Sequence, residues 1–117
     1  MPPRAADLLQ GTLDMLVMRA VADEPLHGYA LVQRLKLTSG GRLTVPHGSL
    51  YPALHRLERK GWVESEWGIS DNNRRAKFYR HTAAGRAQFR AKAPAWHRYA
   101  DAIAAALRAT SPDVVGA

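Results

Sequence analysis

The segment that most constrains the fold is residues 48–61, because a single helix there would carry two chemically different faces. At about 100° per residue, Leu50, Leu54 and Leu57 share one stripe, which requires a hydrophobic core. The opposite face has no long apolar side chain and carries Gly48, Pro52, His55, Arg56 and Arg59. Small residues permit close approach and cations attract a polyanion, so the pattern predicts a helix that lies against nucleic acid. Taken alone, the segment fits an amphipathic surface helix with a solvated basic face equally well.

After Gly61 the pattern changes to that of a β-hairpin. Residues 62–67 and 76–81 are rich in aromatic and β-branched side chains, which predicts two short strands. The intervening residues 68–75 combine turn-forming Gly, Asp and Asn with two arginines, whose forked donors fit a phosphate or a guanine edge. A helix followed by a basic-tipped hairpin is typical of a winged helix-turn-helix. A solvated hairpin loop is the alternative.

Two more helices are predicted before this unit. Residues 12–22 place their larger apolar side chains on one face, which predicts a core helix. Residues 23–25 end it, and the second helix is expected to open at Leu26 and to run to residue 37. The glycines at 40 and 41 break that helix, and residues 43–45 are expected to form a third strand at the base of the hairpin.

The longest predicted helix covers residues 83–108, with Thr82 as its N-cap. Apolar residues recur along it in heptads, and the expected dimerisation residues are Phe89, Trp96, Tyr99, Ile103 and Ala106. A chain of 117 residues has little remaining hydrophobic core against which this apolar stripe could be buried, so a partner copy is expected to cover it. Packing back on its own domain is the alternative. Trp96 has a second interpretation, as the wall of a pocket for a planar aromatic effector.

Four ordered motifs extend over most of the chain. They are LHGY at 26–29, GSLYPALHRLE at 48–58, GWVESEW at 61–67 and YRHTAAGR at 79–86. Together they resemble the PadR family of bacterial transcriptional regulators, and the resemblance covers residues 8–107. It implies a dimeric DNA-binding protein, usually a repressor that a small molecule or another signal releases from its operator.

The sequence therefore predicts a mainly α fold with a small β-hairpin wing (α+β). A winged helix-turn-helix domain is expected over 8–82 and a dimerisation helix over 83–108, with disordered tails at 1–7 and 111–117. The expected DNA contacts on the recognition helix are His47, Ser49, Tyr51, His55, Arg56 and Arg59, the last of these to phosphate. Those on the wing are Asn73, Arg74, Arg75 and Lys77.

Three positions depart from the family pattern. The stretch 44–47 lacks the usual polar N-cap, so Pro46 must start the recognition helix through its preset φ. His81 stands where the family usually has leucine, and we expect a partly buried, hydrogen-bonded ring; a pH sensor is the alternative. Pro94 removes one backbone donor and is expected to interrupt or kink the last helix.

Charge and composition agree with a polyanionic partner. Lys and Arg total 17 against 10 Asp and Glu, a formal charge of +7. The absence of cysteine excludes disulfides, zinc-finger thiolates and thiol catalysis. No apolar run approaches about 18 residues and no signal-peptide core is seen, so we expect a cytoplasmic protein with no membrane partner.

No motif supports catalysis, and neither a cofactor nor a metal is expected. The five histidines and ten carboxylates lack the spacing of a metalloprotease helix or of an acid and base pair. The alternative function is non-specific binding of nucleic acid, as in an RNA-binding or chromosome-architectural protein. Competition by unrelated DNA would separate that class from an operator-binding regulator.

Overall fold

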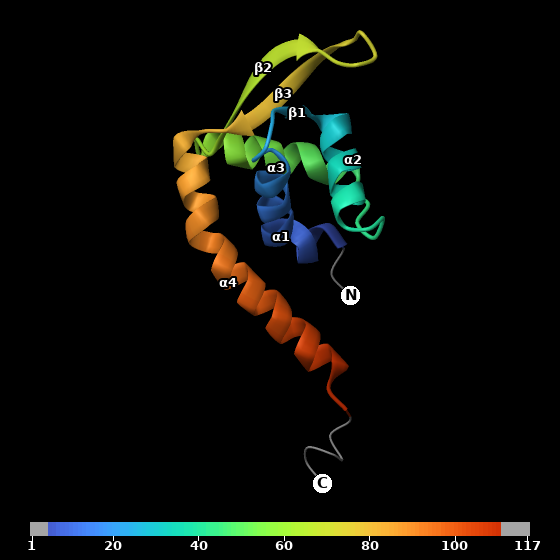
Figure 1. Ribbon diagram of the computed structural model, residues 1–117, viewed down its shortest axis with the longest axis vertical. Coiled ribbons are helices and arrows are strands. Elements are labelled where there is room, and N and C mark those ends of the chain that lie inside the picture. The colour runs from blue at the N-terminus through green and yellow to red at the C-terminus, as the bar shows by residue number, and fades with distance from the viewer. Residues whose placement is uncertain (1–4, 111–117) are drawn as a thin grey trace.

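The structure, a computed structural model, describes residues 5–110, with side chains from residue 11 onward. Within these residues the elements are α1 (Ala5–Ala20), β1 (Leu26–His27), α2 (Gly28–Thr38), α3 (His47–Arg59), β2 (Val63–Ile69), β3 (Arg75–His81) and α4 (Ala83–Arg108). Figure 1 shows α1, α2 and α3 gathered beneath a small sheet, with α4 extending away from them. The predicted mainly α fold with a hairpin wing is confirmed. The first helix begins at Ala5, before the expected residue 12, so the tail predicted at 1–7 is wrong for residues 5–7. Residues 1–4 and 111–117 lie outside the described part.

The core lies where α1, α2 and α3 meet the base of the sheet. Leu50, Leu54 and Leu57 of α3 are fully buried, which confirms the apolar stripe. Val17 of α1 and Leu31 of α2 are also fully buried against them. Each such side chain contributes about 1.5–3 kcal/mol when it leaves water, so this cluster fixes the orientation of α3.

The sheet has three antiparallel strands in the order β1-β3-β2. The hairpin is confirmed, since β2 and β3 pair from Val63 opposite His81 to Ile69 opposite Arg75. The third strand predicted at residues 43–45 is wrong, because those residues have no regular structure and β1 pairs with β3 instead. The second helix consequently begins at Gly28 and not at Leu26.

The reason for that correction lies in what residues 43–46 do in the fold. Val45 is buried in the core. Pro46, which cannot donate to a strand ladder, is the N-cap of α3 with φ −65° and no side-chain cap hydrogen bond. Its carbonyl accepts from the Leu50 amide at 3.0 Å, so the proline starts the helix through its backbone as predicted.

The junction between the wing and α4 is tightly packed. Thr82 is the N-cap of α4: its Oγ1 accepts from the Gly85 amide at 2.9 Å and donates to the Gly61 carbonyl at 2.6 Å. Gly85 is buried, and a Cβ there would lie 1.8 Å from the carbonyl oxygen of Trp62. The predicted cap is confirmed, and only glycine permits this approach of α4 to the start of β2.

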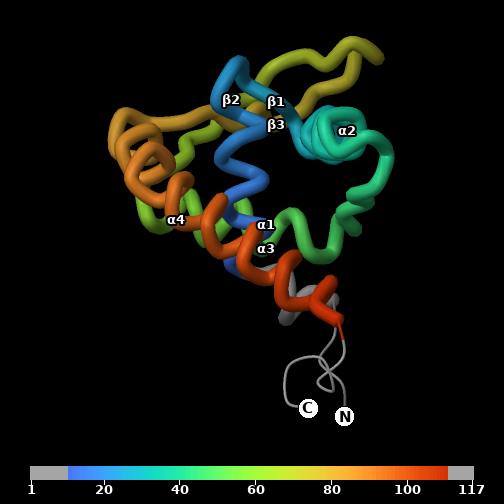
Figure 2. The backbone as a smooth tube through the Cα atoms, turned by 60° about the horizontal axis from the view of Figure 1, so that its bottom comes forward, coloured from blue at the N-terminus to red at the C-terminus, as the bar shows by residue number. Residues whose placement is uncertain are grey.

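The last helix, α4, remains one helix through Pro94 and bends part-way along its length (Figure 1). Pro94 therefore does not interrupt it. In both Figure 1 and Figure 2 its C-terminal half runs away from the sheet. Neither α4 nor any other helix within residues 5–110 combines the length and apolarity needed to cross a membrane.

Candidate nucleic-acid interface

The outer face of α3 is exposed and polar. His47, Tyr51, His55 and Arg59 are exposed along it, while the leucines on the opposite face are buried. The rings of His47 and Tyr51, one turn apart, stack with centroids 5.9 Å apart and an interplanar angle of 21°. They lie in the N-terminal half of the helix, the part from which recognition helices contact base edges.

Tyr51 also determines how α2 meets α3. Gly28, the first residue of α2, is buried, and a Cβ there would lie 2.4 Å from the Tyr51 hydroxyl oxygen. The tyrosine therefore occupies the space that any other residue at position 28 would fill. This contact places the Tyr51 hydroxyl beside the N-terminus of α2.

The two faces of the wing differ in charge, because cross-strand partners in a hairpin share a face. The outer face carries Glu64 and Glu66 together with Arg80, whose Nε donates to Glu64 at 2.9 Å and whose Nη1 lies 3.9 Å from Glu66. The inner face carries Arg75 and Lys77, and no carboxylate lies on that face of β2 or β3. The inner face of β2 and β3 is therefore cationic, whereas the outer face carries two glutamates against one arginine.

The tip of the wing is a tight turn. The Ser70 amide donates to the Arg74 carbonyl at 2.8 Å, and the Asn73 amide donates to the Ser70 carbonyl at 2.8 Å. Asn73 has φ +61°, a left-handed conformation that asparagine tolerates better than most residues. Asn73 therefore shapes the turn that exposes Arg74.

A groove of about 670 Å³ separates the inner face of the wing from the helices. Its lining includes His27, Tyr29, Tyr51, Trp67, Arg74, Arg75 and Lys77. Tyr51 is the predicted α3 contact that lines this groove, and it meets the predicted wing contacts Arg74, Arg75 and Lys77 there. The other predicted residues of α3 lie outside the groove lining. Trp67 was not identified as a site residue from the sequence. The available signal was the alternation along β2, which places exposed Trp67 on the same face of the strand as buried Val63.

Residues 17–91, from α1 through the wing into α4, match the sequence profile of the Transcriptional regulator PadR-like family. The chain belongs to the PadR-like family. Transcriptional regulator Rv3488 of Mycobacterium tuberculosis is 42% identical over 71 residues, 61% of this chain and 63% of that protein.

Solved structures show the same relationship to PadR-like proteins. A PadR family transcriptional regulator from Eggerthella lenta is 35% identical with a TM-score of 0.67, covering 89% of this chain and 88% of that one. A PadR-like transcription factor from Bacteroides fragilis is 27% identical with a TM-score of 0.68, covering 83% and 91%. The resemblance inferred from the four motifs is confirmed, and this PadR-like chain belongs with DNA-binding regulators and not with enzymes.

Two of the predicted contacts of this PadR-like regulator lie away from its outer α3 face. Arg56 lies on the flank that faces α1, and its Nη2 lies 2.7 Å from a carboxylate oxygen of Asp14. Its Nε is buried without an acceptor among the described residues. Ser49 is half-buried on the same flank, two turns earlier. We therefore assign Arg56 to the contact between α1 and α3 and not to the nucleic-acid interface.

The predicted dimer stripe of α4 divides into two parts. Phe89 packs against the core of its own chain, and Trp96 is half-buried, close enough that a Cβ on Gly11 of α1 would lie 3.5 Å from its ring. Further along α4 the apolar side chains are exposed, with Tyr99 at 61%, Ile103 at 42% and Leu107 at 82%; Ala106 is exposed as well. The alternative of packing on the same domain thus applies to the first half of α4 only.

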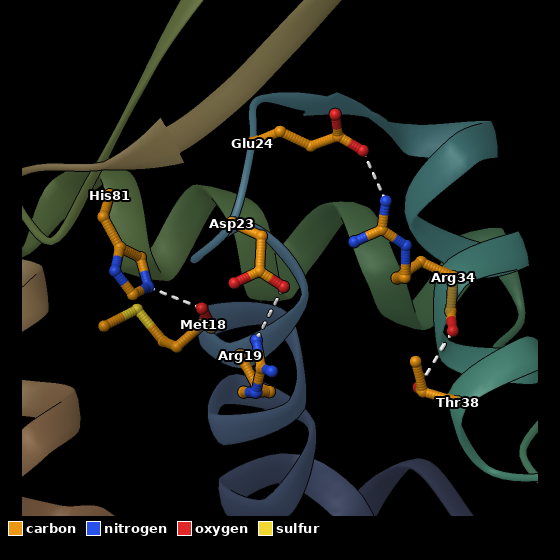
Figure 3. A network of polar contacts seen from close by, with 7 residues as sticks. All are labelled: Met18, Arg19, Asp23, Glu24, Arg34, Thr38 and His81. Atoms are coloured by element: carbon orange, nitrogen blue, oxygen red, sulfur yellow. Dashed lines mark hydrogen bonds and ion pairs between the residues drawn. The ribbon is translucent and has the colours of Figure 1, made fainter.

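His81 is buried at the base of the wing, and the expected hydrogen bond is present. Its Nε2 bonds to the Met18 carbonyl at the end of α1, as Figure 3 shows. Its ring lies 6.0 Å from that of Phe89 on α4. Burial lowers the pKa of His81 below the ordinary 6.5, nearby Arg86 adds to this effect, and the bond to Met18 opposes it. The neutral ring is favoured where α1, β3 and α4 meet.

Proposed function

We propose that this PadR-like regulator is a repressor that binds a palindromic operator as a homodimer, with α3 in the major groove and the wing on adjacent backbone. The observation that carries this proposal is the groove between the wing and the helices, where Tyr51 of α3 shares one surface with cations of the wing. Contact with a polyanion explains why the wing pairs Arg80 with glutamates on its outer face and leaves Arg75 and Lys77 on its inner face.

The proposed contacts divide by chemistry. His47, Tyr51 and His55 on the outer face of α3 would meet base edges, whereas Ser49, on the flank that carries Arg56, is left out of these contacts. The phosphate contacts would be Arg59, Arg74, Arg75 and Lys77, with Asn73 shaping the tip. Phosphate contacts set the register of the protein on the duplex, and base contacts select the sequence.

The homodimer is proposed to form through the second half of α4. Tyr99, Ile103 and Leu107 are large apolar side chains that this chain leaves in water. A second copy that covers them would hold two recognition helices at a fixed separation, as a palindrome requires.

Release by a planar aromatic effector is the remaining part of the proposal. A cavity of about 380 Å³ lies between α1 and α4 with Phe89 and Trp96 in its wall, and a second of about 180 Å³ also contacts both rings. The larger volume lies in the range of small-molecule sites. In a Trp62→Phe, Trp67→Phe background Trp96 is the single remaining tryptophan. Planar aromatic compounds should then quench its fluorescence and change operator affinity over the same concentration range. Quenching at unchanged DNA affinity would remove the effector from the proposal.

The DNA-binding proposal is tested by selecting duplexes from a random library with the wild-type protein. Affinity for the enriched duplex is then compared with that for random DNA. We expect at least about 10³-fold preference for the selected duplex. The Arg74→Ala, Arg75→Ala double variant should weaken binding and lower the salt slope by about 1 per lost phosphate contact, while Arg80→Ala, on the outer face, should change neither. Equal binding to selected and random duplexes would instead indicate a non-specific nucleic-acid binder.

A further inference from the structure

The inner face of the wing carries an exposed aromatic side chain stacked with a cation. The guanidinium carbon of Arg75 lies 4.4 Å from the ring centroid of Trp67. Trp67 pairs with Lys77 and Ile69 with Arg75, so Trp67 and Arg75 are diagonal neighbours on one face of the hairpin. Trp67 is 56% exposed, and both residues line the groove between the wing and the helices.

This stack differs from the way the fold holds other arginines. Arg80 and Arg56 are held through their N–H groups by Glu64 and Asp14, so their donors are engaged by carboxylates. A guanidinium over an indole is held through its flat face, and its five N–H donors lie in the plane and remain available. The Trp67 ring can therefore orient Arg75 without using the donors that a phosphate needs.

We propose that Trp67 is a positioning residue for DNA binding, whose indole orients the Arg75 guanidinium so that its in-plane donors meet a backbone phosphate. This inference rests on the proposed DNA-binding function of the wing. An exposed arginine loses side-chain freedom when it binds, and a ring that already restricts the guanidinium reduces that loss. The partner of the stack is thus a phosphate of double-stranded DNA, reached through Arg75.

Cation–π contacts at exposed sites are weak but measurable. Their usual strength converts to about a two- to fivefold change in affinity when the ring is removed. Trp67→Phe keeps an aromatic face and should retain most of the affinity. Ile69→Ala is the matched control, because Ile69 is an exposed apolar residue on the same face, directly opposite Arg75, but has no π face on which the guanidinium could stack.

The experiment measures binding of a fluorescein-labelled duplex enriched by selection on the wild-type protein, between about 50 and 200 mM salt. The variants are Trp67→Ala, Trp67→Phe, Arg75→Ala, the Trp67→Ala, Arg75→Ala double variant and Ile69→Ala. Thermal unfolding of each confirms that the wing remains folded. We expect Trp67→Ala to lose about two- to fivefold, Trp67→Phe and Ile69→Ala to lose little, and the double variant to bind like Arg75→Ala alone.

The outcomes separate the inference from the function on which it rests. If Trp67→Ala weakens binding equally with and without Arg75, the indole acts on DNA directly or through folding, and the positioning role is overturned. If Arg75→Ala weakens binding and Trp67→Ala does not, the inference also fails while the wing assignment stands. If neither Arg75→Ala nor Arg74→Ala changes affinity or salt slope, the proposed wing contact itself fails.

Discussion

The carboxylate of Asp14 on α1 lies 2.7 Å from the guanidinium of Arg56 on α3. Both side chains are largely covered, at 17% and 23% exposure, so this is a contact between helices and not a surface pair. Asp14 also lines the cavity of about 180 Å³ beside Trp96. The ion pair therefore joins the helix that packs against α4 to the helix proposed to read DNA.

Removing either partner of this pair should destabilise the fold. Arg56→Ala leaves a half-buried carboxylate without its donor, and we expect a loss of about 1–3 kcal/mol in the free energy of unfolding. Urea denaturation measures it. Arg59→Ala, an exposed change on the same helix, should leave stability nearly unchanged and reduce the salt slope of DNA binding. If Arg56→Ala instead reduced the salt slope of DNA binding and left stability unchanged, Arg56 would have to be assigned to the DNA contacts.

Gly28→Ala should disturb the recognition helix from a position outside it. The added Cβ would lie 2.4 Å from the Tyr51 hydroxyl oxygen, so the tyrosine must move. We expect specific DNA binding to weaken by about 1–3 kcal/mol, the usual size of one base contact. Competition with random duplex measures this loss.

Two further variants control for folding at this contact. Gly48→Ala adds a methyl that meets nothing within 4 Å, so it should not lower stability. In a Tyr51→Ala background Gly28→Ala should cost no further stability or affinity, because the clash has gone. Equal effects of Gly28→Ala with and without Tyr51 would contradict this explanation.

Stability should depend on pH through His81. Its pKa is lowered by burial, so below the ordinary value of 6.5 the unfolded chain binds the proton before the folded one does. The stability that the neutral His81 ring contributes is fully present above pH 6.5 and is lost as the pH falls through the folded pKa. The slope is at most about 1.4 kcal/mol per pH unit. His81→Leu should remove this slope in urea denaturation at a series of pH values. Parallel stability profiles for wild type and His81→Leu would contradict the assignment.

The exposed half of α4 should control association. Ile103→Asp places a charge where a partner is proposed to bury an apolar side chain. Because such burial is worth about 1.5–3 kcal/mol, the dissociation constant of the dimer should rise by at least about tenfold. Asp101→Ala, on the opposite side of the helix, should leave association unchanged. Analytical ultracentrifugation measures both. A wild-type chain that is monomeric at micromolar concentration would refute the proposed dimer.

The elements that the sequence predicted well are those with a strong period. The leucines of α3 and the change of period after Gly61 identified this helix and the hairpin, because burial on one face determines both patterns. Strand β1 was missed because Leu26–His27 is too short to carry a period. Its pairing with β3 depends on where the chain turns after α1, which is a tertiary property.

The site was only partly predictable for similar reasons. Arg56 lies at the edge of the polar face of α3, where Asp14, 42 residues earlier, decides that it turns inward. The heptad pattern of α4 continues past Trp96, but the bend of the helix determines which part of it packs against α1. The Trp67–Arg75 stack depends on strand register, and an exposed tryptophan gives no periodic signal.

The close approach of Gly85 to the Trp62 carbonyl has a consequence for operator choice. Because α4 approaches the start of β2 this closely, we expect the winged-helix domain not to rotate relative to α4 in the proposed dimer. Each added base pair between half-sites turns one of them by about 35° around the duplex axis and moves it about 3.4 Å along it. A dimer built on so stiff a junction should reject an operator lengthened by a single central base pair, even when both half-site sequences are intact.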